Sequence, residues 1–351
     1  MQNYALQNVL KSFGLEVYNL FDKTPVKNRF VYVAKKIVKF FLALSGVKKY
    51  QPEFSSTRKA RDKKNDSFYE KFLDNKIYIT RNSILDPDNK ARWSEYDYAI
   101  VGSDMVWHWS ETEDEFKYYY LAFVEPEKRI NYAPSFGLSK YAFENQELHK
   151  KYLAEFEKLS CRESSGCELL KNMTGREIVN VLDPSMLLTV DDYKAIAKKP
   201  DYEIPEHYVI SYFIEELSKD DKRDYKHVIE KVAGGLKNID VFNPNEKKYF
   251  ATSPDEWLWL MEHADFIFTN SFHGAVFSIL FHKQFISFER RAGGMHQKIE
   301  DLLSRFNLNN RIYRNDAKIP DGDINYKFVD EKLNSFRIIS MNYLRDCLNI
   351  K

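Results

Sequence analysis

The stretch 265–290, DFIFTNSFHGAVFSILFHKQFISFER, places one histidine at the expected start of a helix. Its apolar runs predict a strand, a sharp turn, a short apolar helix and a second strand. His273 falls in the first helical turn, where backbone N–H groups are unpaired and carry partial positive charge. Such a turn binds phosphate, and a histidine there can transfer a proton near neutral pH. The stretch indicates phosphate-ester chemistry, although a histidine that only caps its helix gives the same pattern.

The residues beside His273 suit this interpretation. Asn270 or Ser271 can cap the helix, and Gly274 would let an anion approach the backbone closely. His282 lies nine residues after His273, so the two do not form the i, i+4 pair of a zinc-binding helix. We therefore expect an anion site without a metal.

Two arginines are further candidates for binding an anion. Arg162 stands between two predicted helices in SCRESS and could present its guanidinium to a carboxylate or phosphate. The alternative is a surface pair with Glu163. Arg290 follows the predicted strand 285–288 and could form a second contact, with exposed surface charge as its alternative.

A different set of residues suits a sugar. Gly102, Ser103 and Asp104 end a short apolar strand and would place small polar groups and a carboxylate at its carboxyl end. Trp107 could stack on a sugar ring. The alternatives are that Asp104 caps the following segment and that Trp107 belongs to the core.

Composition limits the class of protein. The 351 residues, 44% of them apolar, favour two domains. A formal net charge of +1 argues against a general nucleic-acid binder. Three cysteines without CxxC spacing predict neither a disulfide framework nor a zinc site. With no signal-peptide pattern at the N-terminus, we expect a cytoplasmic protein.

The segment 26–64 differs from the rest because it has twelve Lys or Arg residues against two acids. Apolar residues keep helical spacing on one of its faces, at Val31, Ala34, Val38 and Phe41. A basic amphipathic helix of this kind can lie on an anionic membrane surface. The alternative is a helix packed on its own domain.

From Asp97 onward, predicted strands alternate with helices, which indicates an α/β protein with parallel sheets covered on both faces. We expect an N-terminal domain at 1–190 that contains the basic insert, a linker at 191–205, a C-terminal domain at 206–325 and a final helix at 326–351. The functional cleft would lie between the domains, at the carboxyl ends of the strands.

Six segments, in this order, resemble the polysaccharide pyruvyl transferase family: YALQNVLKSFG (4–14), YDYAIVGSDMVW (96–107), INYAPSFG (130–137), LSCRESSGCELLKNMTG (159–175), VLDPSMLL (181–188) and TNSFHGAVFSILFHKQFISF (269–288). The resemblance implies two Rossmann-like domains facing across a cleft as in GT-B glycosyltransferases. The N-terminal domain would take the acceptor and the C-terminal domain the donor.

The resemblance also implies a reaction. Phosphoenolpyruvate, as co-substrate and without a bound cofactor, would give its pyruvyl group to two hydroxyls of a sugar. The acceptor would be a cell-surface exopolysaccharide or capsule, or its lipid-linked oligosaccharide precursor, and the product a cyclic ketal. By the same resemblance His273 would be the acid/base and Arg162 would hold the donor. Residues 102–104 and Trp107, which suit a sugar, lie within the expected acceptor-side domain.

Two departures from the family pattern matter. Family members usually begin with a strand and loop ahead of YALQ, so we expect the first strand of the N-terminal domain to be missing here. Some members carry an arginine just before the histidine, where this chain has Asn270 and Ser271. Arg290 and Lys298 are then the candidates left to supply that charge.

Two other functions stay open. One is a GT-B glycosyltransferase that uses a nucleotide sugar, with Glu289 as the only obvious acidic residue for the ribose. The other is a non-catalytic relative in polysaccharide assembly. In each case we expect a cytoplasmic location, with peripheral contact at the inner face of the plasma membrane through 26–64.

Overall fold

The computed structural model describes residues 1–23, 52–107, 112–136, 145–214, 219–243, 245–289, 296–314 and 317–350. The strands are β1 Asn19–Asp22, β2 Lys76–Ile79, β3 Ala99–Gly102, β4 Arg129–Tyr132, β5 Leu159–Cys161, β6 Ile178–Asn180, β7 Tyr208–Tyr212, β8 Lys237–Asp240, β9 Phe266–Thr269, β10 Phe285–Phe288 and β11 Ile312–Tyr313.

The α-helices are α1 Gln2–Ser12, α3 Pro52–Phe72, α4 Arg81–Leu85, α5 Lys90–Ser94, α6 Glu113–Tyr119, α7 Gln146–Leu153, α8 Ser164–Thr174, α9 Val190–Lys194, α10 Lys219–Ala233, α11 Lys247–Phe250, α12 Pro254–His263, α13 Phe272–Leu280, α14 Gln297–Arg305 and α15 Tyr326–Cys347. Short 3-10 turns lie at Pro87–Asn89, Pro126–Lys128, Pro184–Met186 and Asn309–Arg311. The α/β class is confirmed.

The C-terminal half is built on one parallel sheet in the order β11-β10-β9-β7-β8. All four residues of β10 are buried, as a parallel strand with helices on both faces requires. The apolar helix α13 lies between β9 and β10 in the chain, so the strand, turn, helix and strand predicted for 265–290 are confirmed. The sheet thereby fixes the direction of the first turn of α13.

The N-terminal half contains three separate parallel pairs, β1-β2, β3-β4 and β5-β6, instead of one hydrogen-bonded sheet. Side chains replace the backbone ladder between β4 and β5. Ser160 N donates to Asn131 Oδ1 at 2.8 Å, and Ala133 N donates to Ser160 Oγ at 3.1 Å. The prediction that a helix directly precedes Arg162 is wrong, because α7 ends at Leu153 and β5 begins at Leu159.

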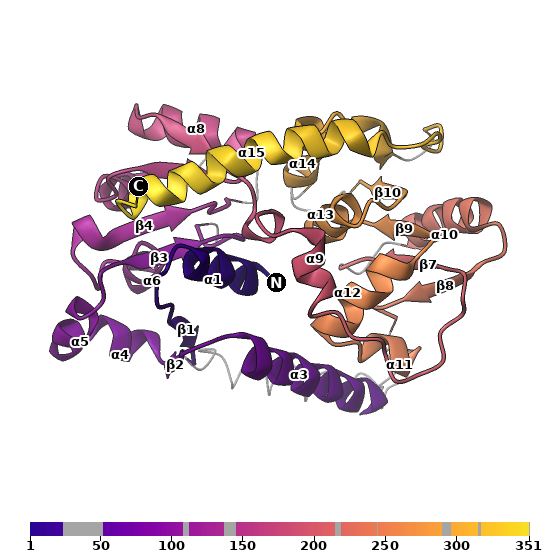
Figure 1. Ribbon diagram of the computed structural model, residues 1–351, viewed down its shortest axis with the longest axis horizontal. Helices are drawn as coiled ribbons and strands as arrows, with labels where there is room; N and C mark the ends of the chain where they lie inside the picture. Colours follow the sequence, from indigo (N-terminus) through magenta and orange to yellow (C-terminus); the bar gives the residue numbers. More distant parts are fainter. Residues whose placement is uncertain are drawn as a thin grey trace.

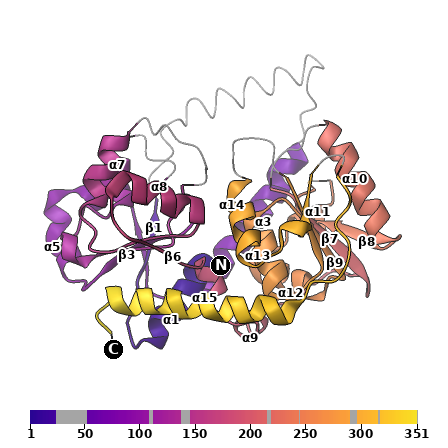
Figure 2. The ribbon, with the colours of Figure 1, turned by 90° about the horizontal axis from the view of Figure 1, so that it is seen from above.

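Helix α15 packs against both halves (Figure 1, Figure 2). Its Ser340 Oγ accepts a hydrogen bond from Leu182 N at 2.9 Å in the N-terminal half. The Tyr326 hydroxyl donates to Ser278 O on α13 at 3.3 Å in the other half. The largest buried apolar cluster is also continuous across the halves. α15 therefore fixes the loop after β6 relative to α13.

Helix α3 shows what part of the basic segment 26–64 does. Lys64 Nζ pairs with the buried Glu256 carboxylate of α12 at 2.8 Å. The Arg61 guanidinium lies 4.5 Å from the centre of the Phe242 ring. These side chains pack on the C-terminal half, whereas the packing alternative placed the helix on its own, N-terminal domain. The amphipathic pattern at 31–41 lies outside the described residues.

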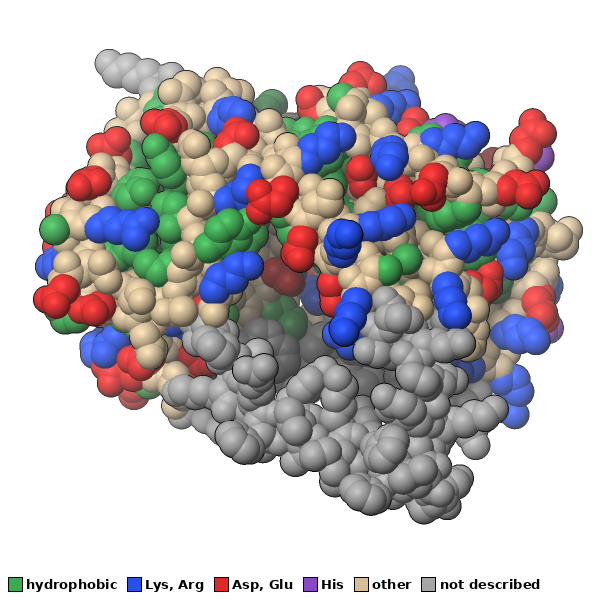
Figure 3. Space-filling model, turned by 90° about the horizontal axis from the view of Figure 1, so that it is seen from below, with side chains coloured by type: hydrophobic (Ala, Val, Ile, Leu, Met, Phe, Trp, Pro, Cys, Tyr) green, Lys and Arg blue, Asp and Glu red, His purple; other side chains and the backbone are tan. Residues whose placement is uncertain are grey.

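None of the helices in the described ranges is both long and apolar enough to cross a bilayer. Between the two halves the surface is hollowed, and the rim of this hollow carries both basic and acidic side chains (Figure 3).

The core of the N-terminal half contains a histidine held among aromatic rings. Trp107 and Phe116 each stack on Tyr120. His149 Nδ1 lies 2.5 Å from the Tyr120 hydroxyl, and its ring meets the edge of Phe116. Burial disfavours the charged imidazole and lowers the pKa of His149 from 6.5 to about 4.

We expect His149 to make the fold sensitive to mild acid. Its folded pKa lies below its unfolded pKa, so between pH 6.5 and 4 the unfolded chain binds the extra proton. The free energy of unfolding should fall by about 3 kcal/mol over that range. His149→Gln should flatten this slope, whereas His263→Gln, at an exposed position, should keep it. Urea unfolding at several pH values measures both, and an unchanged slope in His149→Gln would contradict the assignment.

Candidate active site

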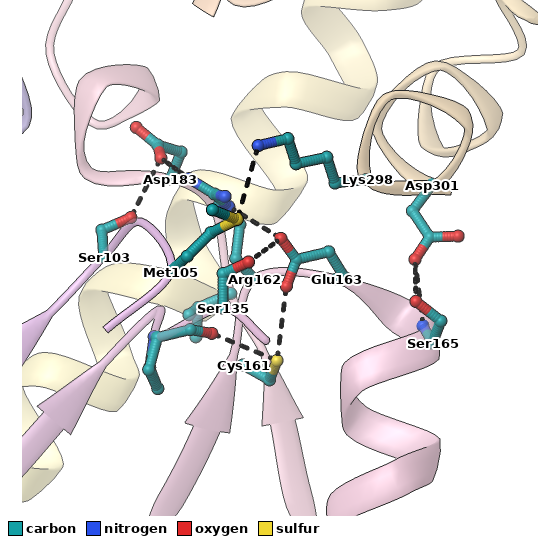
Figure 4. A network of polar contacts seen from close by, with 12 residues as sticks. Ser103, Met105, Ser135, Cys161, Arg162, Glu163, Ser165, Asp183, Lys298 and Asp301 are labelled. Atoms are coloured by element: carbon teal, nitrogen blue, oxygen red, sulfur yellow. Dashed lines mark hydrogen bonds and ion pairs between the residues drawn. The ribbon is translucent and has the colours of Figure 1, made fainter. Parts of the chain in front are cut away.

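The carboxyl ends of four N-terminal strands and the start of α13 meet around one buried carboxylate, Asp183 (Figure 4). Ser103 follows β3, Ser135 follows β4, and Arg162 follows β5. Asp183 itself opens the turn Pro184–Met186 after β6. Parallel strands end at one edge of the fold, so residues distant in sequence converge there.

Asp183 Oδ2 has polar partners from several segments. Gln2 Nε2 donates to it at 2.7 Å, Ser103 Oγ at 3.0 Å and Arg162 Nη1 at 2.8 Å. His273 Nε2 lies 3.8 Å away, an ion-pair distance rather than a hydrogen bond. Burial alone would raise the pKa of Asp183. The contact with His273 and the charge of Arg162 outweigh burial and hold the pKa well below its usual value.

The loop that carries Asp183 is fixed by other elements. Asp183 Oδ1 accepts hydrogen bonds from Ser185 N and Oγ at 3.0 and 2.5 Å. Arg337 of α15 donates to Met186 O at 2.7 Å, and the Tyr132 hydroxyl donates to Leu182 O at 2.9 Å. The carboxylate therefore sits on a rigid support.

Arg162 is 3% exposed and its charge is already matched. Nε donates to Glu163 Oε1 at 3.1 Å, and the guanidinium lies 4.0 Å from the centre of the Phe272 ring. Burial would lower its pKa, but the charges of Glu163 and Asp183 raise it instead. Only Nη2 has no hydrogen-bond partner among the described residues. Arg162 is thus a buried ion pair beneath His273, and its role in donor binding stays a prediction.

His273 occupies the first turn of α13, as predicted. Ser271 is the N-cap residue but makes no side-chain cap bond. The imidazole is 29% exposed, and Nε2 is buried on the side of Asp183.

A cavity of about 240 Å³ lies against His273. Two aromatic side chains of the C-terminal half, Tyr212 and Trp257, form part of its wall. Helix α3 contributes Arg61, Asn65 and Tyr69. The cavity joins a titratable imidazole, aromatic faces and a guanidinium from three separate parts of the chain.

The residues predicted to bind an anion beside His273, namely Asn270, Ser271 and Gly274, each make contacts that support the fold. A Cβ at Gly274 would lie 2.1 Å from Thr269 Oγ1, so glycine is needed there for packing α13 against β9, and its contact with an anion stays a prediction. Asn270 is buried and its Oδ1 accepts a hydrogen bond from Ile214 N at 3.0 Å. Ser271 N donates to Thr269 Oγ1 at 3.0 Å.

The acceptor candidates separate into two kinds. Gly102 packs against β4, since a Cβ there would lie 2.5 Å from Tyr132 O. Trp107 is 0% exposed and stacks on Tyr120, so it is a core residue, which corrects its acceptor role. Ser103 and Asp104 have positive φ values of 30° and 58°. Strained backbone of this kind concentrates at functional sites, and the exposed Asp104 stays a candidate.

Of the two remaining candidates for a cation, only Lys298 lies within the described residues. Arg290 lies outside the described residues. Lys298 is buried, with Nζ 4.0 Å from Met105 Sδ. Within the described ranges, one group could offer three metal ligands within 4.8 Å: Glu289, His296 and Glu300. Arg314 forms ion pairs with both carboxylates and so already takes the place of a cation.

Sequence reasoning did not single out Asp183 or the cavity residues of α3, and it expected any Arg162–Glu163 pair at the surface, whereas both side chains are buried. Asp183 is the N-cap of the turn Pro184–Met186. Its position directly after a predicted parallel strand was the available signal, because such ends carry ligands. Arg61 gave no signal beyond the basic composition of its segment.

We expect Asp183→Asn to destabilise the fold by about 3–5 kcal/mol, because Arg162 would be left with an uncompensated buried charge. The contribution of Asp183 is present above its unfolded pKa near 3.8 and is lost as pH falls through its lower folded pKa, so it is complete at pH 7. Asp74→Asn, which breaks the exposed Lys11 pair, should change stability by less than about 1 kcal/mol. Equal effects in urea unfolding at pH 7 would refute the central role of Asp183.

Comparison with known proteins agrees with this geometry. A search of curated proteins gave no match. The sequence model of the family described as polysaccharide pyruvyl transferase matches residues 1–291. This range holds Ser103, Arg162, Asp183 and His273 and is most of the chain. The protein therefore belongs to the polysaccharide pyruvyl transferase family, whose members transfer pyruvyl groups onto polysaccharide.

Proposed function

We propose that this protein transfers the pyruvyl group of phosphoenolpyruvate to two hydroxyls of a sugar in a cell-surface polysaccharide or its lipid-linked precursor. The observation that carries the proposal is the position of His273, which lies on the wall of a small cavity with Asp183 behind it. His273 would be the proton donor and Asp183 the residue that orients it.

The chemistry needs one proton donor and an anion site. A proton goes to the methylene carbon of phosphoenolpyruvate, which becomes a methyl group, and C2 becomes a cation. One sugar hydroxyl attacks C2, phosphate leaves, and a second hydroxyl closes the ketal. The two hydroxyl protons replace the proton given to carbon and protonate the released phosphate, so His273 ends in its starting state. A positioned acid contributes roughly 10²–10⁴-fold to such a reaction.

Asp183 suits the supporting role because it is held rigidly and is ionised. Its Oδ2 lies 3.8 Å from Nε2 of His273, and the His273 side chain also lines the cavity. Arg162 donates to the same carboxylate oxygen at 2.8 Å and holds Asp183 in place beside the imidazole. The carboxylate would then orient His273 through its charge.

The size of the cavity favours a small donor. Its volume of about 240 Å³ is below the roughly 300–1,000 Å³ typical of pockets for larger ligands. A three-carbon phosphorylated acid suits this volume better than a nucleotide sugar. We infer further that the two halves work as facing donor and acceptor sides in the GT-B manner. The cysteines among the described residues are all free, which supports a cytoplasmic location.

We expect His273→Ala to lower ketal formation by roughly 10²–10⁴-fold while phosphoenolpyruvate still raises the melting temperature. Ketal on a panel of sugar acceptors can be followed by mass spectrometry and phosphate release. His282→Gln, at an exposed position just after α13, should retain activity. Full activity in His273→Ala would remove its catalytic role. Stabilisation by nucleotide sugars but not by phosphoenolpyruvate would favour a glycosyltransferase instead.

A further inference from the structure

Arg61 of α3 is a cation on the cavity wall without a matching carboxylate. Among the described residues that line the cavity it is the one lysine or arginine, and none of the ion pairs in the described ranges includes it. Its guanidinium packs on Phe242 and Phe250, with 4.5 and 5.3 Å to the ring centres. Burial lowers the pKa of Arg61, as expected for a charge removed from water.

A second basic residue of α3, Lys64, does have a carboxylate partner, so of the two only Arg61 lacks one among the described residues. Lys64, three residues further on, also faces the C-terminal half, and Glu256 matches its charge at 2.8 Å. Lys64 and Arg61 of one helix therefore both contact the C-terminal half, and of these two only Arg61, at the cavity, has no carboxylate partner within the described ranges. A charge withdrawn from water without a partner is unfavourable, and an anionic ligand in the cavity would remove that penalty.

The other arginine near His273 cannot supply this contact as it stands. Arg162 is enclosed by Glu163, Asp183 and the Phe272 ring, and it does not line the cavity. Arg61 and His273 do line the same space, with the aromatic faces of Tyr212 and Trp257 beside them. The cavity thus offers a guanidinium for a planar or tetrahedral anion, apolar surface for a short carbon skeleton, and an imidazole for the proton.

We propose that Arg61 is the donor-binding cation of this protein and holds one anionic end of phosphoenolpyruvate, its carboxylate or its phosphate. The inference rests on the proposed function and makes it specific. The guanidinium fork matches either group with two parallel hydrogen bonds. Helix α3, which comes from the N-terminal part of the chain, would then complete a donor site on the C-terminal half.

The test is calorimetric titration of full-length protein with phosphoenolpyruvate, inorganic phosphate and pyruvate. Arg61→Gln should weaken phosphoenolpyruvate binding at least tenfold, and Arg61→Lys, which keeps the charge but not the fork, should weaken it less. Arg58→Gln, an exposed neighbour on α3, should bind as the wild type does. The ligand-free Arg61→Gln protein should melt no lower than the wild type, because it loses an unmatched charge. A purely structural arginine would give the opposite result.

Titration with phosphate and with pyruvate also shows whether Arg61 binds the phosphate or the carboxylate of phosphoenolpyruvate. A loss of affinity for phosphate alone places the phosphate there, and a loss for pyruvate alone places the carboxylate there. Equal phosphoenolpyruvate affinity in wild type and Arg61→Gln overturns this inference and leaves the proposed function standing. A wild-type protein that binds none of the three probes overturns both.

Discussion

One buried carboxylate holds the site together. Asp183 is 1% exposed, and its Oδ2 is shared by Gln2, Ser103 and Arg162, with His273 just beyond hydrogen-bond reach. A carboxylate in such a place stays ionised only if positive charge compensates the loss of water. Arg162 provides that charge permanently, so the imidazole of His273 stays available for a second task. In the proposed mechanism, the proton transfer by His273 thus depends on this buried ion pair.

The fold maintains this arrangement by fixing the strand ends from outside. The β4 and β5 strands are joined by Asn131 and Ser160 rather than by a backbone ladder. The same Asn131 carbonyl accepts a hydrogen bond from Tyr343 of α15 at 3.0 Å. α15 also reaches α13 through Tyr326. Because one helix contacts the loop of Asp183 and the helix of His273, the distance between these residues does not depend on either half alone.

The features that the sequence could predict are those formed by residues close together in the chain. The position of His273 was predictable because β9, α13 and β10 are consecutive and strongly apolar. The surroundings of Asp183 were not, since its partners are separated from it by 21, 80 and 181 residues. β5 has only three residues, too few to show the alternation of a strand, so the sequence pattern predicts a helix before Arg162. The core position of Trp107 depends on its stacking against Tyr120, a contact that local sequence patterns do not show.

The segment that resisted sequence interpretation is the one that completes the cavity. Its basic composition suggested a membrane surface, but α3 turns Lys64 and Arg61 toward the protein, where their fates differ. Glu256 is buried and also accepts the hydrogen bond of Ser253 N in the cap of α12, so Lys64 anchors α3 at a rigid point. Anchoring one cation places its neighbour, less than one helical turn away, at the cavity wall. Of these two basic residues, Lys64 therefore attaches α3 to the C-terminal half, and Arg61 lies at the cavity without a carboxylate partner in the described part of the chain.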